Sequence, residues 1–434
     1  MKKILILGKG KSGLAAKKLA EKKGFVCTMA NDEDDVFEES ELSSFSFVVT
    51  SPGFSPQNKW ILACKKAKLR LVSELDFGLM HLASKNVIAI TGTNGKTTTA
   101  SLLAQILSKS KKTFLLGNIG MPLCEKVLEI EEGDFVVLEV SSFMLFQSQL
   151  LHPKVAVILG ISPDHKEWHG SFAAYKRAKL KIFENQTKDD FSVVYDGFCE
   201  KTKGKVLLFS TSNCVLGAYE ENGNIIYNNG NIHEVVAQSS TVLLWGKHNM
   251  QNVLAAVAAS KCLGISNEQI STTLKNFAAP EHRLQKIGEV KGILFVNDSK
   301  STNPNSTSVA IDSTKMPIVL LAGGHEKGLS MKEPFEKAAK KQCKIVCFGE
   351  CGKRFFKEAK CAGIKHVFLE ENLQKAFDCA TKCSKKGDVV LLSPGTSSFD
   401  EFQNYEERGR AFEQLVKKFD KKNAKTNSNV SMQI

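Results

Sequence analysis

Three times along this chain of 434 residues, a short apolar run leads into a glycine-containing turn or a hinge and then into helical patterns. The first apolar run covers residues 4–7 and is followed by glycines at 8, 10 and 13. The second covers residues 87–90 and is followed by Gly-Thr-Asn-Gly-Lys-Thr at 92–97, and the third begins at residues 293–296. Repeated strand–helix units of this kind predict parallel sheets wrapped by helices. We therefore expect an α/β protein.

The positions of these openings predict three domains and a tail. We expect a Rossmann-like N-terminal domain over residues 1–84, a P-loop-type central ATPase domain with a mostly parallel sheet over 85–279, and a Rossmann-like C-terminal domain over 280–418. The Asn/Gly-rich stretch 220–231 predicts hairpins or loops at the margin of the central domain. Residues 419–434 are rich in Lys, Asn and Ser and have little to bury, so we expect a flexible tail.

The charge balance favours anionic partners. Lys and Arg number 59 against 46 Asp and Glu, which gives a formal net charge of +13. A positive chain suits nucleotides and phosphorylated substrates. The lysines are spread along the whole chain without an Arg-rich patch, so we do not expect nucleic acid binding. No apolar run is long enough to span a bilayer and no targeting segment is evident, so we expect a cytoplasmic protein without membrane insertion. A monomer is a separate expectation.

The segment 92–97 is the strongest local signal of chemistry. Its glycines allow a tight loop whose backbone amides can surround a phosphate, and the following helix N-terminus adds partial positive charge. Lys96 adds a full charge, and the Thr97 hydroxyl can hold Mg²⁺. The usual P-loop has an earlier glycine where this chain has Ile90. The alternative is a glycine turn with a surface lysine, but the strand and helix on either side favour phosphate binding.

The glycines at 8, 10 and 13 follow a strand pattern and open a helix, and Asp32 lies about twenty residues further on. This spacing fits a dinucleotide fingerprint. On its own it suits NAD or any diphosphate on a helix N-terminus, and Lys11 within the turn favours a diphosphate.

Three further features are open to two interpretations each. Glu139 ends a predicted strand, where it is either a Mg²⁺ ligand or a surface carboxylate. His165 and His169 have the spacing of one helix face, which suits either zinc or ordinary capping and packing, and packing is commoner without a HExxH pattern. The basic segment 175–181 reads as a solvated helix face, and residue chemistry does not single out Lys179 within it.

Taken together, these motifs resemble the ATP-dependent Mur ligases of peptidoglycan synthesis, a family that includes folylpolyglutamate synthetases. The phosphate loop of that family also lacks the earlier glycine. Its other motifs occur in order from Lys3 to about Lys418: Gly-Asn-Ile-Gly at 117–120, Glu-Val-Ser-Ser-Phe at 139–143, Asp-His at 164–165, the basic helix at 175–181, Gly-Lys-His-Asn-Met-Gln-Asn at 246–252, Glu-His-Arg at 281–283 and Asn-Asp-Ser-Lys-Ser-Thr-Asn at 297–303.

The resemblance implies an ATP site with two Mg²⁺ ions, in which Lys96 and the loop amides hold the phosphates. It implies that Thr97 and Glu139 ligate one Mg²⁺, and that His165 and a carbamylated Lys179 place the second. Lys96, Glu139, His165 and Lys179 would be the catalytic residues. The residues implied at ATP are Gly92, Thr93, Asn94, Gly95, Lys96, Thr97, Thr98, Asn249, Asn252, Arg283 and Asp298.

Within the family, the short first domain, Ser51-Pro52-Gly53 and the segment 392–409 resemble the members that add D-glutamate to UDP-N-acetylmuramoyl-L-alanine. The implied reaction forms an acyl phosphate from ATP, which the D-glutamate amine then attacks. The residues implied at the UDP substrate are Lys11, Ser12, Asn31, Asp32, Ser51 and Asn118. Those implied at D-glutamate are Lys300, Thr302, Lys327, Ser398, Phe399 and Tyr405.

Three other functions remain to be weighed. Another Mur-type or folylpolyglutamate ligase would use the same chemistry with a different amino acid. An NAD-dependent oxidoreductase would use the first glycine fingerprint but leaves the loop at 92–97 without a role. A nucleotide-binding regulator without enzymatic activity would bind ATP without amino-acid-dependent ADP release.

Overall fold

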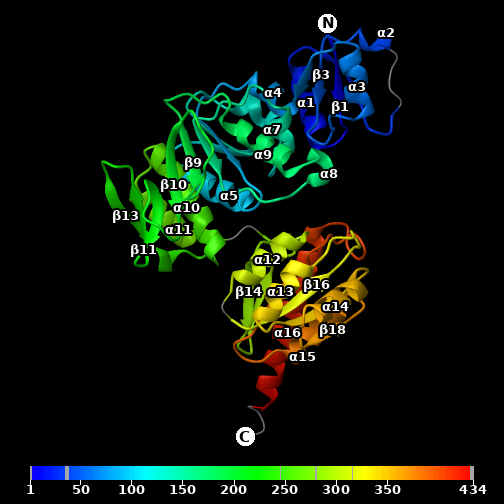
Figure 1. Ribbon diagram of the computed structural model, residues 1–434, viewed down its shortest axis with the longest axis vertical. Coiled ribbons are helices and arrows are strands. Elements are labelled where there is room, and N and C mark those ends of the chain that lie inside the picture. The colour runs from blue at the N-terminus through cyan, green and yellow to red at the C-terminus, as the bar shows by residue number, and fades with distance from the viewer. Residues whose placement is uncertain (1, 35–38, 245, 279–280, 315, 431–434) are drawn as a thin grey trace. The chain divides into compact units, whose positions relative to one another are not determined.

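The computed structural model describes all residues except 1, 35–38, 245, 279–280, 315 and 431–434, and it describes no side chain at 39 or 422–430. The chain forms two compact units (Figure 1). The first consists of Met1–Val242 with Asn249–Phe277, and the second of Leu243–His248 with Ala278–Ile434. Each unit is built of sheets covered by helices, as the sequence predicts for an α/β protein.

The first unit begins with a four-stranded parallel sheet in the order β2-β1-β3-β4. Residues 4–7 of its central strand are buried, as expected for a parallel strand covered on both faces. The strands are β1 (Lys3–Leu7), β2 (Val26–Ala30), β3 (Val48–Thr50) and β4 (Leu71–Ser73). The helices are α1 (Lys11–Lys22), α2 (Glu39–Leu42), α3 (Lys59–Lys66) and α4 (Glu74–Leu79).

A nine-stranded sheet follows, in the order β13-β12-β11-β10-β9-β8-β5-β7-β6. It is parallel from β6 to β11, and β12 and β13 pair antiparallel. The hairpin predicted near 220–231 is formed by β11 and β12. The strands are β5 (Val87–Thr91), β6 (Thr113–Gly117), β7 (Phe135–Glu139), β8 (Val155–Ile158), β9 (Phe191–Tyr195), β10 (Lys205–Ser210), β11 (Gly217–Glu221), β12 (Asn224–Asn228) and β13 (His233–Gln238). The helices are α5 (Lys96–Leu107), α6 (Leu123–Lys126), α7 (Ser142–Gln147), α8 (Lys166–His169), α9 (Phe172–Leu180), α10 (Lys247–Cys262) and α11 (Asn267–Asn276).

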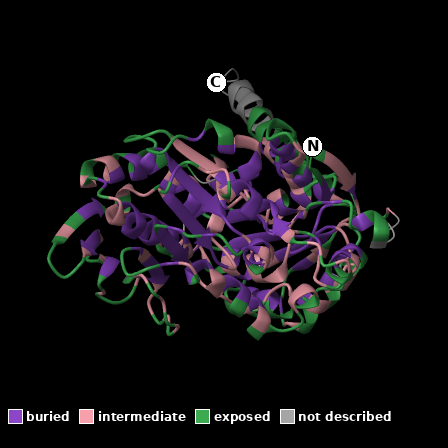
Figure 2. Ribbon diagram, turned by 90° about the horizontal axis from the view of Figure 1, so that it is seen from above, coloured by how far each residue is buried: buried purple, intermediate pink, exposed green. Residues whose placement is uncertain are grey.

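The two sheets of the first unit share an apolar core. Ile4 and Val49 of the smaller sheet belong to the same buried cluster as Val136 of the larger one (buried residues in Figure 2). Glycine allows this packing at Gly78 of α4, where a Cβ would lie 2.8 Å from Leu123 Cγ of α6. The predicted boundary between residues 84 and 85 falls between the two sheets and stays a prediction, as do the other domain bounds.

The second unit has a six-stranded sheet in the order β14-β15-β19-β16-β17-β18, parallel except for β14. Its central strand β16 is buried along its whole length, so helices are needed on both faces. The strands are β14 (Gln285–Val290), β15 (Ile293–Asn297), β16 (Ile318–Gly323), β17 (Lys344–Phe348), β18 (Val367–Leu369) and β19 (Val389–Leu392). The helices are α12 (Pro304–Asp312), α13 (Lys332–Lys340), α14 (Gly352–Cys361), α15 (Leu373–Cys383) and α16 (Tyr405–Val430).

The C-terminal segment continues α16 as far as Val430, and its last four residues lie outside the described part of the chain. The flexibility predicted for residues 419–434 therefore stays a prediction. None of the helices that the structure describes combines the length and apolar character needed to cross a membrane.

Candidate active site

The predicted phosphate loop joins β5 to α5 in the nine-stranded sheet. Gly95 stands at the N-cap of α5 with a φ of +83° and offers no capping side chain. The positive end of the helix is thus left without a side-chain cap, an arrangement suited to anions. The backbone conformation at Gly95 favours glycine, and a Cβ there would lie 2.2 Å from Asn252 Oδ1 of α10, so that the Asn252 side chain would have to move.

Two lysines meet on one carbonyl of this loop. Lys96 Nζ donates to the oxygens of Gly92 at 2.8 Å and Thr93 at 2.9 Å. Lys179 Nζ, which comes from α9, donates to the same Gly92 oxygen at 2.9 Å and to Thr91 Oγ1 at 3.3 Å. The structure therefore places Lys179 against the phosphate loop. The sequence pattern alone did not distinguish Lys179 from the other basic residues of segment 175–181.

Lys179 is the one basic residue of α9 that is buried, with 1 % of its surface exposed, whereas Arg177 on the same helix is exposed. Its Nζ lies 4.9 Å from the centre of the Tyr175 ring. Burial, together with the nearby charge of Lys96, lowers the pKa of Lys179 to about 6. The expectation of a solvated helix face is therefore wrong at this position, and the amine is largely uncharged at neutral pH.

Tyr175 has no predicted role, yet the structure places it in the site. It is buried, and its hydroxyl lies 3.1 Å from Thr93 Oγ1 of the phosphate loop. The sequence could have indicated Tyr175 only because Tyr175 begins the motif at 175–181.

Glu139 ends β7, which pairs with β5 beside the phosphate loop. Its side chain is buried; Oε1 accepts from Asn118 Nδ2 at 2.9 Å, while Oε2 has no hydrogen-bond partner among the described residues. A buried carboxylate oxygen is costly to leave unsatisfied. This oxygen, with the buried Thr97 hydroxyl on the adjacent loop, fits the hard oxygen ligands that Mg²⁺ prefers. The structure pairs Asn118 with Glu139, and the predicted contact of Asn118 with the sugar end of the UDP substrate stays a prediction.

His165 and His169 do not share a zinc site in the described residues, where no group of three or more His, Cys, Asp and Glu side chains could hold a metal. His165 has a φ of +47° at the start of α8, and its ring lies 4.8 Å from that of Phe143. His169 Nε2 pairs with Ser142 Oγ at 3.0 Å, and burial lowers the pKa of His169. His165 Nε2 lies 3.7 Å from Asp164 Oδ2 and its Nδ1 lies 3.8 Å from Glu167 Oε1, and a metal-ligand role for His165 stays a prediction.

The first glycine fingerprint forms the tight turn that its spacing predicts. A Cβ at Gly13 would lie 1.8 Å from the Gly8 oxygen, so α1 packs directly on the end of β1. Ser51 Oγ lies beside Gly8 and is buried with no hydrogen-bond partner among the described residues. Lys11 is exposed at the start of α1. The Asp32 carboxylate accepts from the Asn58 amide.

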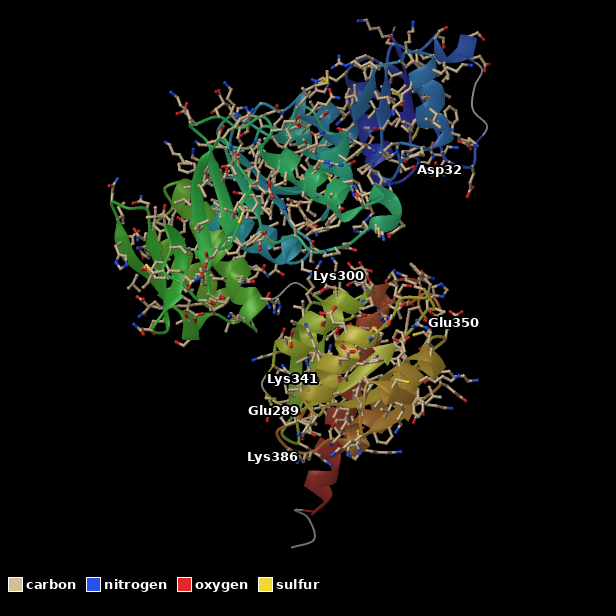
Figure 3. The ribbon with its side chains drawn as sticks, viewed as in Figure 1. Asp32, Glu289, Lys300, Lys341, Glu350 and Lys386 are labelled. Carbon is tan, nitrogen blue, oxygen red and sulfur yellow. The ribbon has the colours of Figure 1, made fainter. Side chains whose placement is uncertain are left out.

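In the second unit, the predicted residues lie on loops that follow β15, β16 and β19. Figure 3 shows Lys300 and Glu350 towards one end of this unit and Lys341 and Lys386 towards the other. The first end is the carboxyl edge of the parallel strands, where α/β proteins bind ligands. Lys300 Nζ lies 5.1 Å from the centre of the Tyr405 ring.

The remaining predicted residues of this unit differ in how open they are to a ligand. Ser398 is buried, whereas Phe399 is 66 % exposed with its ring 6.3 Å from that of His325. Thr302 donates its amide to the Lys300 oxygen at 2.9 Å.

Asp298, predicted near the ATP ribose, is buried at the end of β15. Its carboxylate accepts from the Ser301 hydroxyl, from Ser393 Oγ at 2.8 Å and from the Leu284 amide at 3.2 Å. Burial raises the pKa of Asp298 to about 6. These contacts join the loops after β15 and β19, and contact with a nucleotide stays a prediction, as it does for Arg283.

Arg408 is a buried cation for which the sequence pattern assigned no role. Its guanidinium donates to the Ser299 oxygen at 2.9 Å, to the Thr396 and Ser397 oxygens at 3.1 Å each, and to Ser299 Oγ at 3.0 Å. One side chain thus joins the loops that carry Lys300 and Ser398. The sequence could have indicated Arg408 only because Arg408 lies within the segment 392–409.

Sequence comparison identifies the family. The Mur ligase middle domain matches residues 90–260, and the Mur ligase glutamate ligase domain matches residues 282–396. The UDP-N-acetylmuramoylalanine–D-glutamate ligase of Thermoanaerobacter pseudethanolicus is 36 % identical over 96 % of this chain and 98 % of its own. That of Listeria monocytogenes serotype 4b is 34 % identical over 95 % of both chains.

The chain belongs to the Mur ligase family. Its fold agrees: the UDP-N-acetylmuramate–alanine ligase of Thermotoga maritima matches 96 % of this chain and 100 % of its own with a TM-score of 0.61 and 19 % identity. The MurF ligase of the same organism, solved with ADP, matches 96 % of this chain and 95 % of its own with a TM-score of 0.61 and 18 % identity. The chain is therefore an amide-forming ligase, and the oxidoreductase alternative loses its support.

Proposed function

We propose that this chain is an ATP-dependent, ADP-forming ligase that joins D-glutamate to UDP-N-acetylmuramoyl-L-alanine in the synthesis of a peptidoglycan precursor. The observation that carries the proposal is the 36 % identity over nearly the full length with a relative named for joining these two groups. The phosphate loop and the converging lysines supply the means of using ATP. The net charge of +13 suits three anionic substrates.

The chemistry must make the substrate carboxylate electrophilic. Transfer of the ATP γ-phosphoryl group to that carboxylate breaks the terminal phosphoanhydride and forms an acyl phosphate and ADP. The D-glutamate amine then attacks the acyl carbon, and inorganic phosphate leaves from a tetrahedral intermediate as the amine loses its proton. Phosphoryl transfer depends mainly on positioning and on charge neutralisation. Lys96 and the uncapped end of α5 provide positive charge for the ATP phosphates.

Two groups of side chains fit Mg²⁺. Thr97 and the unsatisfied oxygen of Glu139 would hold one ion, and His165 with Lys179 would hold the other. Mg²⁺ bound there would neutralise charge on the phosphoryl group that is transferred. Asn118 acts through Glu139 by fixing the direction of its carboxylate.

Lys179 must lose its proton to take part in such a site. The neutral amine can attack CO₂ to form an N-carboxylysine with release of one proton, which converts a cation into an anion with two oxygens. The depressed pKa of Lys179 favours this reaction at neutral pH. The carboxylates of Asp164 and Glu139 favour the protonated form, but burial and the charge of Lys96 outweigh them.

The substrates would be divided between the two units. Lys11, Ser12, Asn31, Asp32 and Ser51 would bind the UDP group. Lys300, Thr302, Lys327, Ser398, Phe399 and Tyr405 would bind D-glutamate, with Asn249, Asn252, Arg283 and Asp298 at the nucleotide of ATP. Location in the cytoplasm and a monomeric state also stay predictions.

An assay of ADP release with a panel of amino acids tests the proposal. The purified protein is given Mg²⁺, ATP, UDP-N-acetylmuramoyl-L-alanine and one of D-glutamate, L-glutamate, L-alanine or diaminopimelate. We expect ADP release and a new amide, identified by mass spectrometry, with D-glutamate. Lys96→Ala should lose this activity, whereas Lys111→Ala, an exposed lysine beyond α5, should keep it. Preference for another amino acid would refute the proposal.

A further inference from the structure

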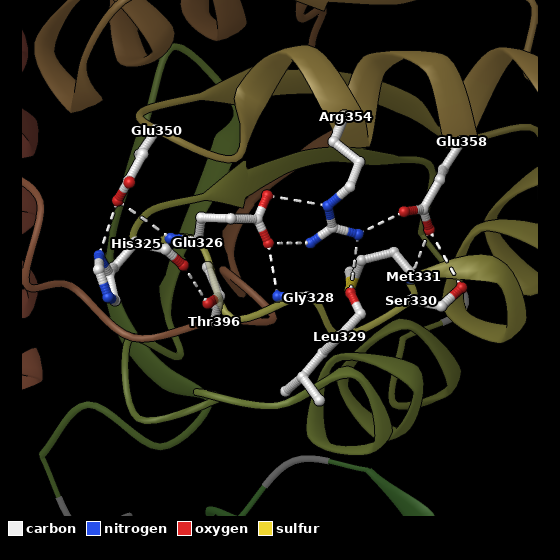
Figure 4. A network of polar contacts seen from close by, with 10 residues as sticks. All are labelled: His325, Glu326, Gly328, Leu329, Ser330, Met331, Glu350, Arg354, Glu358 and Thr396. Atoms are coloured by element: carbon white, nitrogen blue, oxygen red, sulfur yellow. Dashed lines mark hydrogen bonds and ion pairs between the residues drawn. The ribbon is translucent and has the colours of Figure 1, made fainter.

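The loop at residues 324–331 follows β16 and carries Lys327, a predicted D-glutamate residue, near its middle. Figure 4 shows a polar network in which Glu326 of this loop is joined by Glu350, Arg354 and Glu358 from a neighbouring segment. Arg354 and Glu358 come from α14, while Glu350 precedes that helix.

Glu326 is held by Arg354 through both carboxylate oxygens. Arg354 Nε donates to Oε2 at 2.9 Å and Nη2 donates to Oε1 at 2.7 Å, and the Gly328 amide donates to Oε1 at 2.6 Å. Two parallel donations of this kind fix geometry as well as charge. The guanidinium lowers the pKa of Glu326 to about 2.

The other two carboxylates are engaged as well. Glu358 accepts from Arg354 Nη1, from the Met331 amide at 2.6 Å and from Ser330 Oγ at 3.2 Å. Glu350 lies 2.7 Å from His325 Nδ1 and accepts from the Glu326 amide at 3.2 Å. Every glutamate of the cluster is thus bound to the loop backbone and to a cationic or histidine side chain.

Lys327 lies between two residues of this network, and only its backbone takes part in it, through a hydrogen bond to Glu326. Across the described residues, no carboxylate approaches Lys327 Nζ within ion-pair distance. Lys327 is exposed at the surface, and partial desolvation of its ammonium group lowers its pKa, with the charge of Arg408 acting in the same direction. A lysine without a carboxylate partner, beside a glutamate that is fully engaged elsewhere, is a cation left for an anionic ligand.

We propose that Arg354 is a positioning residue that holds Glu326 away from Lys327, so that the Lys327 ammonium group remains open to the carboxylate of the amino-acid substrate. This inference rests on the proposed function, because it takes D-glutamate as that substrate. Glu326 is adjacent to Lys327 in the chain, so loss of Arg354 leaves an unpaired carboxylate beside an unpaired ammonium. The two would then neutralise each other at the expense of substrate binding.

The charge state of Lys327 provides a readout that does not depend on catalysis. Lysines are labelled with ¹³C at Cε in the full-length protein, and the Lys327 signal is assigned from its absence in Lys327→Met. Arg354→Met should raise the Lys327 pKa by about one unit or more, as a new carboxylate neighbour does. Arg354→Met combined with Glu326→Gln should return it to the original value. Lys337→Met is the matched control, because it removes a 2.9 Å ion pair with Asp312 in the same unit.

Steady-state kinetics provide the second readout. Arg354→Met should raise KM for D-glutamate about tenfold with kcat within about twofold, since the change weakens binding of one substrate. Adding Glu326→Gln should restore KM, and Glu326→Gln alone should leave it near the wild-type value. A purely structural role of Arg354 would not be rescued by removing a second charge.

The outcomes separate this inference from the proposed function. If D-glutamate is not ligated but the Lys327 pKa follows the predicted pattern, the proposed function fails and the role of Arg354 is supported. If D-glutamate is ligated and Arg354→Met changes neither the pKa nor KM, the inference is overturned. It is also overturned if the double variant behaves like Arg354→Met, because Arg354 would then act only by shaping the loop.

Discussion

The state of Lys179 can be tested through its reaction with CO₂. Its ordinary pKa is 10.5, and burial beside Lys96 lowers the value to about 6. At pH 7 the neutral fraction is then about 0.9, against about 1 in 3,000 for an ordinary lysine. Because only the neutral amine attacks CO₂, Lys179 should carry a carbamate under conditions in which exposed lysines remain almost entirely free.

The assay is ¹³C NMR of the purified protein in ¹³C-bicarbonate buffers of different pH, with dissolved CO₂ held constant. The ratio of carbamate to free amine should be about 1,000-fold lower at pH 5 than at pH 7. The neutral fraction falls about tenfold, to about 0.09, and the proton that carbamate formation releases is about 100-fold more concentrated. Lys179→Met should lack the signal, and Lys166→Met, which changes an exposed lysine on α8, should retain it. A signal of equal size in Lys179→Met, or one that develops only above about pH 9, would refute this account.

Four further predictions follow from the same contacts. Lys179→Ala should abolish ligation in the ADP-release assay, and high bicarbonate should not restore it; near-normal turnover would exclude the metal role. The urea unfolding midpoint of the wild type, relative to that of Lys179→Met, should rise with pH between about 6 and 10. Over that window the Lys179 amine binds a proton in the unfolded chain but not in the folded chain. Parallel pH profiles of the two proteins would contradict a buried neutral amine. Asn118→Ala should raise the Mg²⁺ concentration needed for half-maximal activity by about 10- to 100-fold, because it releases Glu139; a rise only in KM for the UDP substrate would favour a sugar contact instead. Gly95→Ala should cost about 1–2 kcal/mol from its φ of +83° and more from the clash with Asn252, and should lower Tm and ATP affinity together; unchanged ATP affinity would show that the loop tolerates a side chain.

The amino-acid sequence by itself determined the elements and the phosphate loop. Residues 4–7, 87–90 and 344–348 form strands within a residue of their predicted limits because continuous apolar runs suit parallel strands buried on both faces. The loop at 92–97 is equally local, since glycine conformation and a helix N-terminus act over a few residues. The family resemblance also came from ordered local motifs.

Only the tertiary structure decided which polar side chains act together. Lys179 differs from Arg177 through the packing of α9 against the phosphate loop, which sets its burial and hence its pKa. Asn118 is paired with Glu139 by the adjacency of β6 and β7, and Arg354 is joined to Glu326 across 28 positions of sequence. The sequence gives the chemical type of each residue, but the burial of a side chain and its charge partners depend on neighbours that folding brings together.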